Sequence, residues 1–156
     1  MTETSQPAGP DADPTLSRDL VVSSGAARTK EEAIREAGDL LVRSGAVTPA
    51  YVEAMLERER SISTYMGSYL AIPHGTNESK SGILRSAVSL VRYEQPIDWD
   101  GNEVRVVVGI AGAGGEHLQI LSKVAIVFSD DDLARGILEA GSADEIYDIL
   151  QAVNDD

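Results

Sequence analysis

Apolar residues recur at helical spacing in two stretches near the start of the chain. The first stretch places its apolar side chains on one face of a helix: Ala33, Ile34, Ala37, Leu40 and Leu41. Thr29 and Glu32 form a capping box ahead of this helix, and Gly45 is a stop signal after it. Thr48 and Pro49 predict the start of a second helix, which runs to about residue 60. Its apolar residues share one side: Val52, Met55 and Leu56.

Four runs rich in apolar and β-branched residues predict strands. They cover residues 20–23, 69–72, 86–93 and 103–111. Pro73 ends the second strand, because proline has no amide hydrogen to donate to a neighbouring strand. The run 103–111 is apolar on both faces, as is typical of a central strand that helices cover on each side.

A glycine-rich turn over 112–115 leads into three predicted helices. The first covers 116–128, with one apolar stripe: Leu118, Leu121, Val124 and Ala125. Ser129 is expected to cap the second helix over 130–140, and Gly141 to end it. Ser142 and Glu145 form a capping box before the last helix, whose apolar positions are Ile146, Ile149, Leu150 and Val153. This order of elements predicts an α/β fold, a three-layer sandwich whose mixed, mostly parallel sheet has helices on both faces.

The first fourteen residues differ from the rest in composition. They hold three of the six prolines and no Val, Ile, Leu or aromatic residue, so 1–14 is predicted to be a disordered N-terminal tail. The domain is then expected to span 15–153. No signal peptide and no apolar run of about 20 residues is present, which predicts no insertion into a membrane. The absence of cysteine favours a cytoplasmic location.

The net charge of the chain is −13, from 13 basic and 26 acidic residues. A surface this negative repels a phosphate backbone, so no nucleic acid partner is expected. A metal site is not expected either, because the chain lacks cysteine and any HExxH or comparable spacing of ligands.

Two phosphate-binding motifs are present only in part. The run HGTNESKS has Lys80 where a P-loop needs it, but His74 and Ser79 occupy the two required glycine positions. The glycines of 112–115 follow a strand and open a helix, yet His117 lies where a dinucleotide-binding fingerprint has its last glycine. Neither a nucleotide nor another cofactor is therefore expected.

The only two histidines, His74 and His117, each follow a predicted strand. Ligand crevices of open α/β sheets lie at this edge. Pro73 stiffens the approach to His74 and Gly75 allows close packing after it, so His74 is expected to be exposed and fixed. A neutral imidazole nitrogen is a competent nucleophile toward phosphorus or an acyl carbon. A serine hydrolase is disfavoured, because no GxSxG motif occurs.

Two motifs that each hold a histidine carry a family resemblance. The run YVEAMLERERSISTYMGSYLAIPHGT resembles the segment around the phosphorylated histidine of mannitol-type enzyme IIA domains of the bacterial phosphoenolpyruvate-dependent sugar phosphotransferase system. The run GIAGAGGEHLQILSKVA is similar to a second motif of that family, and KEEAIREAGDLLVRSGAVTPAYVEAM also fits it. The resemblance covers about 16–153, although LAIPHG alone would also suit the fructose-type and nitrogen-regulatory relatives.

The resemblance implies a role for each of three side chains. His74 would be the nucleophile that the phosphocarrier HPr phosphorylates, His117 would stabilise the phosphoryl group, and Arg58 would bind it. The phosphoryl group would then pass to a cysteine of a sugar-specific IIB domain in a membrane IICB component, a domain that this chain lacks. The resemblance therefore implies a transfer that needs no cofactor.

Alternatives to this interpretation stay open at the level of the sequence. A nitrogen-regulatory IIA protein would use the same histidine to switch partner binding without sugar transport, although ERER, STYMG and GGEHLQIL together favour the mannitol type. A small hydrolase is a third reading. Arg58 would be an ordinary exposed arginine if it paired with Glu53 or Glu57, and Arg60 adds a second candidate charge.

Overall fold

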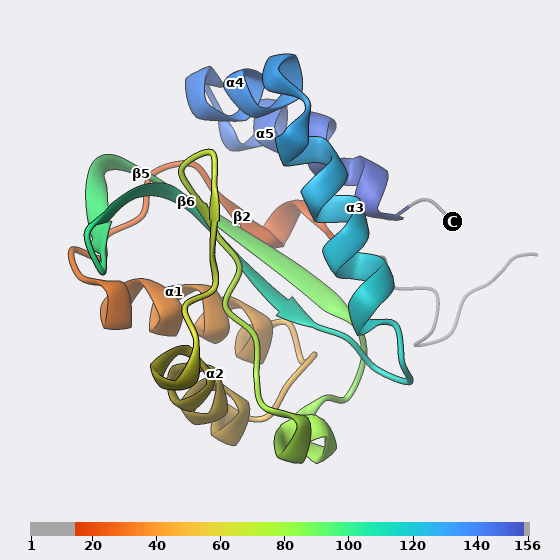
Figure 1. The fold of residues 1–156 in the computed structure, drawn as a ribbon. Coiled ribbons are helices and arrows are strands. Elements are labelled where there is room, and N and C mark those ends of the chain that lie inside the picture. The colour runs from red at the N-terminus through yellow and green to blue at the C-terminus, as the bar shows by residue number, and fades with distance from the viewer. Residues whose placement is uncertain (1–14, 155–156) are drawn as a thin grey trace, which may run out of the picture.

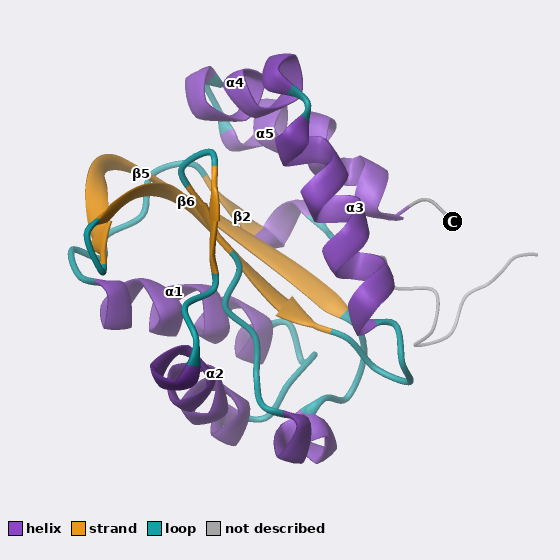
Figure 2. Cartoon of the chain, viewed as in Figure 1, coloured by secondary structure: helices purple, strands orange, loops and turns teal. Residues whose placement is uncertain are grey.

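The protein is described by a computed structural model over residues 15–154, so the predicted tail, 1–14, lies outside the described residues. Within the described part, five α-helices lie on the two faces of one five-stranded sheet (Figure 1). Helices α1 (Lys30–Arg43) and α2 (Pro49–Ser61) lie on one side. Helices α3 (His117–Ser129), α4 (Asp131–Glu139) and α5 (Ala143–Leu150) lie on the other (Figure 2). The predicted three-layer α/β sandwich is confirmed.

The sheet has the strand order β2-β5-β6-β4-β3. These strands are β2 (Val21–Val22), β3 (Tyr65–Gly67), β4 (Leu70–Ala71), β5 (Ala87–Trp99) and β6 (Asn102–Ala111). Strands β2 and β5 pair in parallel, as do β4 and β6, whereas β5 with β6 and β3 with β4 are antiparallel. The sheet is mixed as predicted, but it is not mostly parallel, because its longest pairing is antiparallel.

The antiparallel hairpin of β5 and β6 is the reason for that difference. The sequence predicts that the strand ends at Tyr93, whereas β5 continues past Pro96 through a register shift between Arg92 and Ile97. Proline is tolerated at such an irregularity, where no ladder bond needs its missing amide hydrogen. The chain then reverses at Asp100–Gly101, where both residues have positive φ, and a two-residue turn can join only antiparallel strands.

Most of the predicted helix caps are confirmed. The Thr29 side chain accepts a hydrogen bond from the Glu32 amide, and Ser142 does the same for Glu145. Ser129 does not cap α4. Asp130 is the cap, because its Oδ1 accepts from two backbone amides in the first turn, while the Ser129 hydroxyl donates to a carbonyl of the preceding helix.

The buried face of α3 differs from its predicted stripe. Leu118 is 72% exposed, whereas Val124 of the predicted stripe is buried together with Ile120, Val127 and Phe128. Helix α3 has apolar residues on several sides, so its sequence pattern alone does not define which side packs on the sheet.

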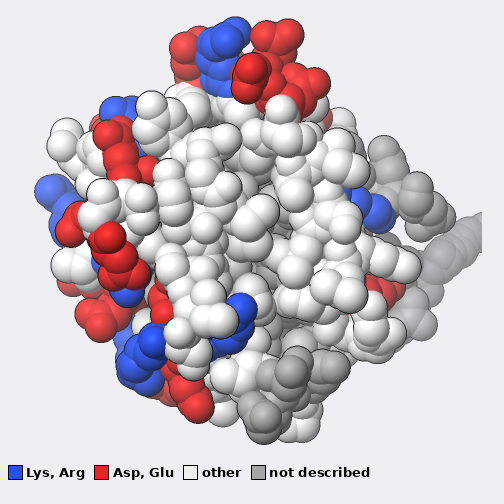
Figure 3. Space-filling model, viewed as in Figure 1, with Lys and Arg blue, Asp and Glu red and all other residues white. Residues whose placement is uncertain are grey.

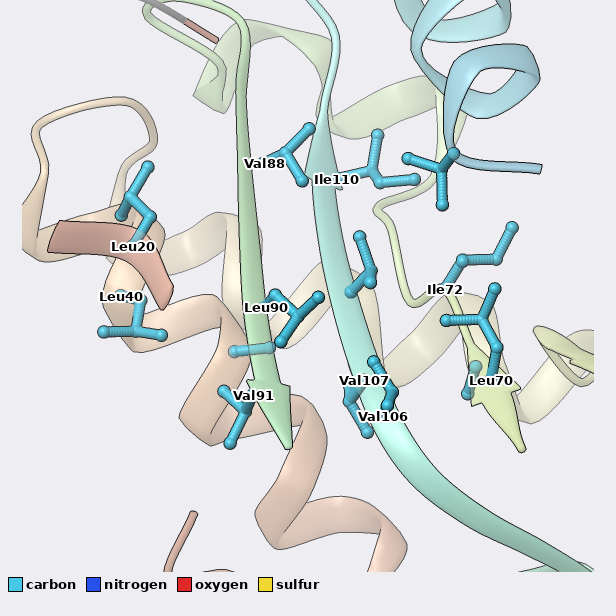
Figure 4. Packing of buried hydrophobic residues seen from close by; sticks show 14 of the residues in the cluster. Leu20, Leu40, Leu70, Ile72, Val88, Leu90, Val91, Val106, Val107 and Ile110 are labelled. Carbon is cyan, nitrogen blue, oxygen red and sulfur yellow. The ribbon is translucent and has the colours of Figure 1, made fainter. Parts of the chain in front are cut away.

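The core between the two helix layers is mainly aliphatic, as the scarcity of aromatic residues predicts. Strands β4, β5 and β6 contribute its centre (Figure 4), and β6 lies in the middle of the sheet as expected. None of the helices in the described part of the chain is long and apolar enough to cross a bilayer.

Candidate functional site

Parallel pairing of β4 with β6 brings together the chain segments that carry the two histidines. Beyond β4, His74 forms an isolated parallel bridge with Ile110, and the Ile110 amide donates to the Pro73 carbonyl at 3.1 Å. His74 therefore lies beside the last residues of β6, directly before the turn that leads to His117.

The imidazole of His74 is buried and held in one orientation. Its residue is 9% exposed, and Nδ1 lies 2.9 Å from the Ile72 carbonyl oxygen. A carbonyl oxygen can only accept, so Nδ1 carries the hydrogen and Nε2 keeps its lone pair. The expectation that His74 is fixed is confirmed, but the expectation that it is exposed is wrong, because the bridge to Ile110 draws the residue onto the sheet edge.

His117 is the first residue of α3 and faces His74. The two ring centroids are 4.8 Å apart, and the ring planes are inclined by 56°. Gly112 allows this approach, since a Cβ on Gly112 would lie only 2.5 Å from the His117 Cα. The glycine-rich turn thus lets the start of α3 pack closely against the end of β6, which brings His117 back toward His74.

Arg58 reaches the same place from the C-terminal half of α2. Its Nη1 donates to the Ile62 carbonyl at 2.9 Å, and the side chain lines a cavity of about 600 Å³ together with both histidines. The other lining residues are Tyr51, Gly75, Thr76, Ile83, Gly112, Gly115 and Leu118. Glu53, one of the two partners considered for Arg58, pairs instead with Arg35 at 2.8 Å.

Arg60 lies at a different place from Arg58. It lines a small separate cavity whose other residues include Lys30, Glu31 and Glu59. Two residues apart on a helix point about 200° from one another, so only one of the two arginines can face His74.

Two polar contacts near the cavity were missed at the level of the sequence. The buried Glu59 carboxylate accepts from the Thr64 amide at 3.0 Å, the Thr64 hydroxyl at 2.5 Å and Trp99 Nε1 at 2.9 Å. The Thr64 carbonyl accepts in turn from the amide of Ile72. This network ties the end of α2, beside Arg58, to the segment that holds His74. The second missed contact is made by Tyr51, whose hydroxyl bonds to the Gly75 amide and the Ile110 carbonyl. Tyr51 and Glu59 both lie in the run that carries the family resemblance, but nothing in the sequence assigns either of them a role.

The surface around this part of the molecule is poor in charge. In Figure 3 the middle of one face consists mostly of uncharged residues, and most acidic and basic side chains lie toward its edge. Leu118, which lines the cavity, is 72% exposed.

Burial lowers the pKa of His74 below the usual 6.5. The Arg58 guanidinium lowers it further, whereas the hydrogen bond to Ile72 and the charge of Glu59 oppose the shift. The neutral, nucleophilic ring is therefore the dominant form at neutral pH. We expect an NMR titration of the His74 ring to show a midpoint below 6.5, and a midpoint at or above 6.5 would contradict this account of its surroundings.

The arrangement suits attack on phosphorus. Nε2 of His74 is a nucleophile, and a guanidinium and a second imidazole lie around the same cavity. Phosphoryl transfer concentrates charge on three equatorial oxygens, which such donors stabilise.

Comparisons with known proteins agree with this chemistry. Residues 15–153 match the family "Phosphoenolpyruvate-dependent sugar phosphotransferase system, EIIA 2". The mannitol-specific phosphotransferase enzyme IIA component of Halalkalibacterium halodurans is 51% identical over 140 residues, which cover 90% of this chain and 97% of that protein.

Two solved structures show how far the fold is shared. Enzyme IIA of the Escherichia coli mannitol system, solved in complex with phosphorylated enzyme IIB, has a TM-score of 0.79 and 35% identity, covering 85% of this chain and 94% of that one. Nitrogen regulatory protein IIA from Neisseria meningitidis has a TM-score of 0.76 and 30% identity, covering 87% and 96%.

Proposed function

Because this chain belongs to the phosphotransferase system EIIA 2 family, we propose that it accepts a phosphoryl group from phospho-HPr on Nε2 of His74 and passes it to a cysteine of a IIB domain. The observation that carries this proposal is the shared cavity, where a nucleophilic imidazole, a second imidazole and a guanidinium converge. The proposal includes a cytoplasmic location, where such a carrier meets HPr.

Each transfer exchanges one bond to phosphorus for another. The Nε2 lone pair of His74 forms a new P–N bond while the P–N bond of phospho-HPr breaks and its electron pair returns to the donor imidazole. In the second step a cysteine thiolate of the IIB domain attacks, and the electron pair of the P–N bond returns to His74. Donor and first acceptor are both imidazole nitrogens, so their leaving abilities are similar.

The neighbouring side chains would act on the charge that develops during transfer. The planar guanidinium of Arg58 can donate two hydrogen bonds to phosphoryl oxygens, and His117 can supply a further N–H donor. The hydrogen bond from Nδ1 to Ile72 keeps Nε2 directed away from that carbonyl. Bond making and breaking then need no large movement of the site.

We assign the mannitol type over the nitrogen-regulatory type. Both share the fold, so the TM-scores do not separate them, but the 51% identity to a mannitol-specific component over nearly its whole length favours the sugar carrier.

Transfer from the phosphorylated chain to a mannitol-specific IIB domain tests this assignment. We expect the phosphoryl group of the phosphorylated chain to move to the IIB cysteine in a single-turnover experiment. Stable phosphorylation of His74 without any transfer to IIB would favour the regulatory alternative.

Replacing Arg58 by lysine should slow phosphoryl acceptance, whereas Arg60→Lys should be nearly silent. Lysine keeps the charge but loses the two-pronged geometry that suits phosphate oxygens. Loss of one charge-assisted hydrogen bond, about 1.5 kcal/mol, corresponds to about tenfold in rate.

Steady-state transfer from phospho-HPr measures both variants under the same conditions. Arg60→Lys is the matched control, because it makes the same chemical change two positions away on the same helix. If the Arg60 variant were the impaired one, Arg58 would not be the arginine that binds the phosphoryl group.

A further inference from the structure

Tyr51 is a cavity residue that the proposed transfer does not use. It lies in the first turn of α2, is 2% exposed and lines the cavity that holds both histidines. Its hydroxyl accepts a hydrogen bond from the Gly75 amide at 2.9 Å and donates one to the Ile110 carbonyl at 2.8 Å. One buried hydroxyl therefore joins the chain after His74 to the last part of β6.

The Tyr51 hydroxyl lies where a parallel strand pair would have a direct backbone hydrogen bond. A residue in a parallel ladder bonds the residues before and after its partner, and Ile110 is the bridge partner of His74. The Ile110 amide donates to the Pro73 carbonyl as such a ladder requires. The companion link, between the Gly75 amide and the Ile110 carbonyl, runs through the oxygen of Tyr51. The phenol thus sets how far the chain after His74 stands from β6.

The same helix face serves the arginine. Tyr51 and Arg58 are seven residues apart, which is nearly two full turns, so they lie on one side of α2. The anchoring of Tyr51 between Gly75 and Ile110 fixes this helix face against both histidine-bearing segments. The packing is close, since a Cβ on Gly75 would lie 2.5 Å from Cε1 of Tyr51.

The hydroxyl keeps both bonds at neutral pH. Burial raises the pKa of Tyr51 above its usual value, so the O–H stays protonated and available as a donor. Its two partners are backbone groups, and the side chain contributes no charge to the cavity.

We propose that Tyr51 is a positioning residue for phosphoryl transfer, whose hydroxyl sets the spacing of His74, His117 and Arg58 around the phosphorus. This inference rests on the proposed function. Tyr51 itself forms no hydrogen bond with the phosphoryl group, because phosphoryl oxygens need a donor and its single O–H is donated to the Ile110 carbonyl. Transfer is sensitive to such spacing, since a misplacement of about 1 Å costs up to about 100-fold in rate.

Tyr51→Phe tests the proposal, because it keeps the packed ring and removes only the hydroxyl. We expect kcat for acceptance from phospho-HPr to fall on the order of tenfold while KM for phospho-HPr stays unchanged. The unchanged KM follows from burial, since a residue 2% exposed offers no surface to the protein donor.

Tyr93→Phe is the matched control. Tyr93 is also 2% exposed, and its hydroxyl bonds to Glu36 at 2.7 Å, but it does not line the cavity of the histidines. Both variants lose one buried hydroxyl, so both are expected to melt at lower temperature, and melting curves give an assay temperature at which all proteins are folded. Only the Tyr51 variant is expected to transfer slowly.

Several outcomes would overturn the positioning role. They are wild-type kinetics for Tyr51→Phe, equal slowing of both variants, a rise in KM alone, or a Tyr51 variant that is unfolded at every assay temperature. In each of these cases a wild-type protein that still takes phosphate on His74 leaves the proposed function intact. A wild-type protein that takes no phosphate would instead remove the proposed function, and this role with it.

Discussion

His74→Ala is expected to abolish phosphate acceptance completely. The variant loses the nitrogen that we propose as the nucleophile, and His117 is not expected to replace it, because we assign His117 to donate to the phosphoryl group. Acid-labile phosphate on the protein, measured after incubation with phosphoenolpyruvate, enzyme I and HPr, should fall to background.

The fold is expected to survive this substitution. His74 follows β4 and contributes one side-chain hydrogen bond, to the Ile72 carbonyl, while the core lies between the sheet and the helices. A circular dichroism spectrum and melting curve close to those of the wild type are the control. A folded His74→Ala protein that still carries acid-labile phosphate would refute the assignment of the nucleophile.

His117→Ala should slow acceptance by about 100-fold without abolishing it. The variant keeps the nucleophile and loses one donor directed at the charge of the transition state, and removal of such a donor in other enzymes costs a factor of about 100 or more. The ring centroids of the two imidazoles are 4.8 Å apart. His117 is therefore close enough to donate a hydrogen bond to a phosphoryl group that His74 carries.

Rapid-quench measurement of phosphate acceptance from phospho-HPr separates this effect from a change in the extent of phosphorylation. The expected pattern is a slow rate with the same final amount of phosphohistidine. Equal rates for the variant and the wild type would show that His117 has only a structural role at the start of α3.

The regular helices and their caps were predictable from the sequence because local signals determine them. Thr29 with Glu32 and Ser142 with Glu145 are such signals, and both capping interactions are present. The apolar stripe of α1 was equally clear. By contrast, α3 has apolar residues on more than one side, so the exposure of Leu118 depends on which side packs against β6, and this is a tertiary choice.

The sheet was harder to predict, because its pairings join distant parts of the chain. Pro96 is an ordinary stop signal for a strand, and only the register shift around it lets β5 continue to Trp99. Strand β3 is three residues long, and the sequence carries no repeating pattern that would reveal it.

The residues of the site also differ in whether the sequence alone could identify them. His74, His117 and Arg58 could be selected because motif residues carried a family resemblance. Tyr51 and Glu59 could not, since their importance comes from bonds to backbone groups and to Thr64 and Trp99 that only the folded chain brings near. The burial of His74 was missed for the same reason: its bridge partner, Ile110, lies far along the sequence.

The most direct test of the central claim is phosphorylation of the wild-type protein itself. The chain is incubated with phosphoenolpyruvate, enzyme I and HPr, and its intact mass is measured before and after acid or base treatment. We expect one phosphate adduct that acid removes and base preserves, which is the behaviour of phosphohistidine, and peptide mapping should locate it on His74. An unmodified protein, or an adduct that acid leaves in place, would contradict the account.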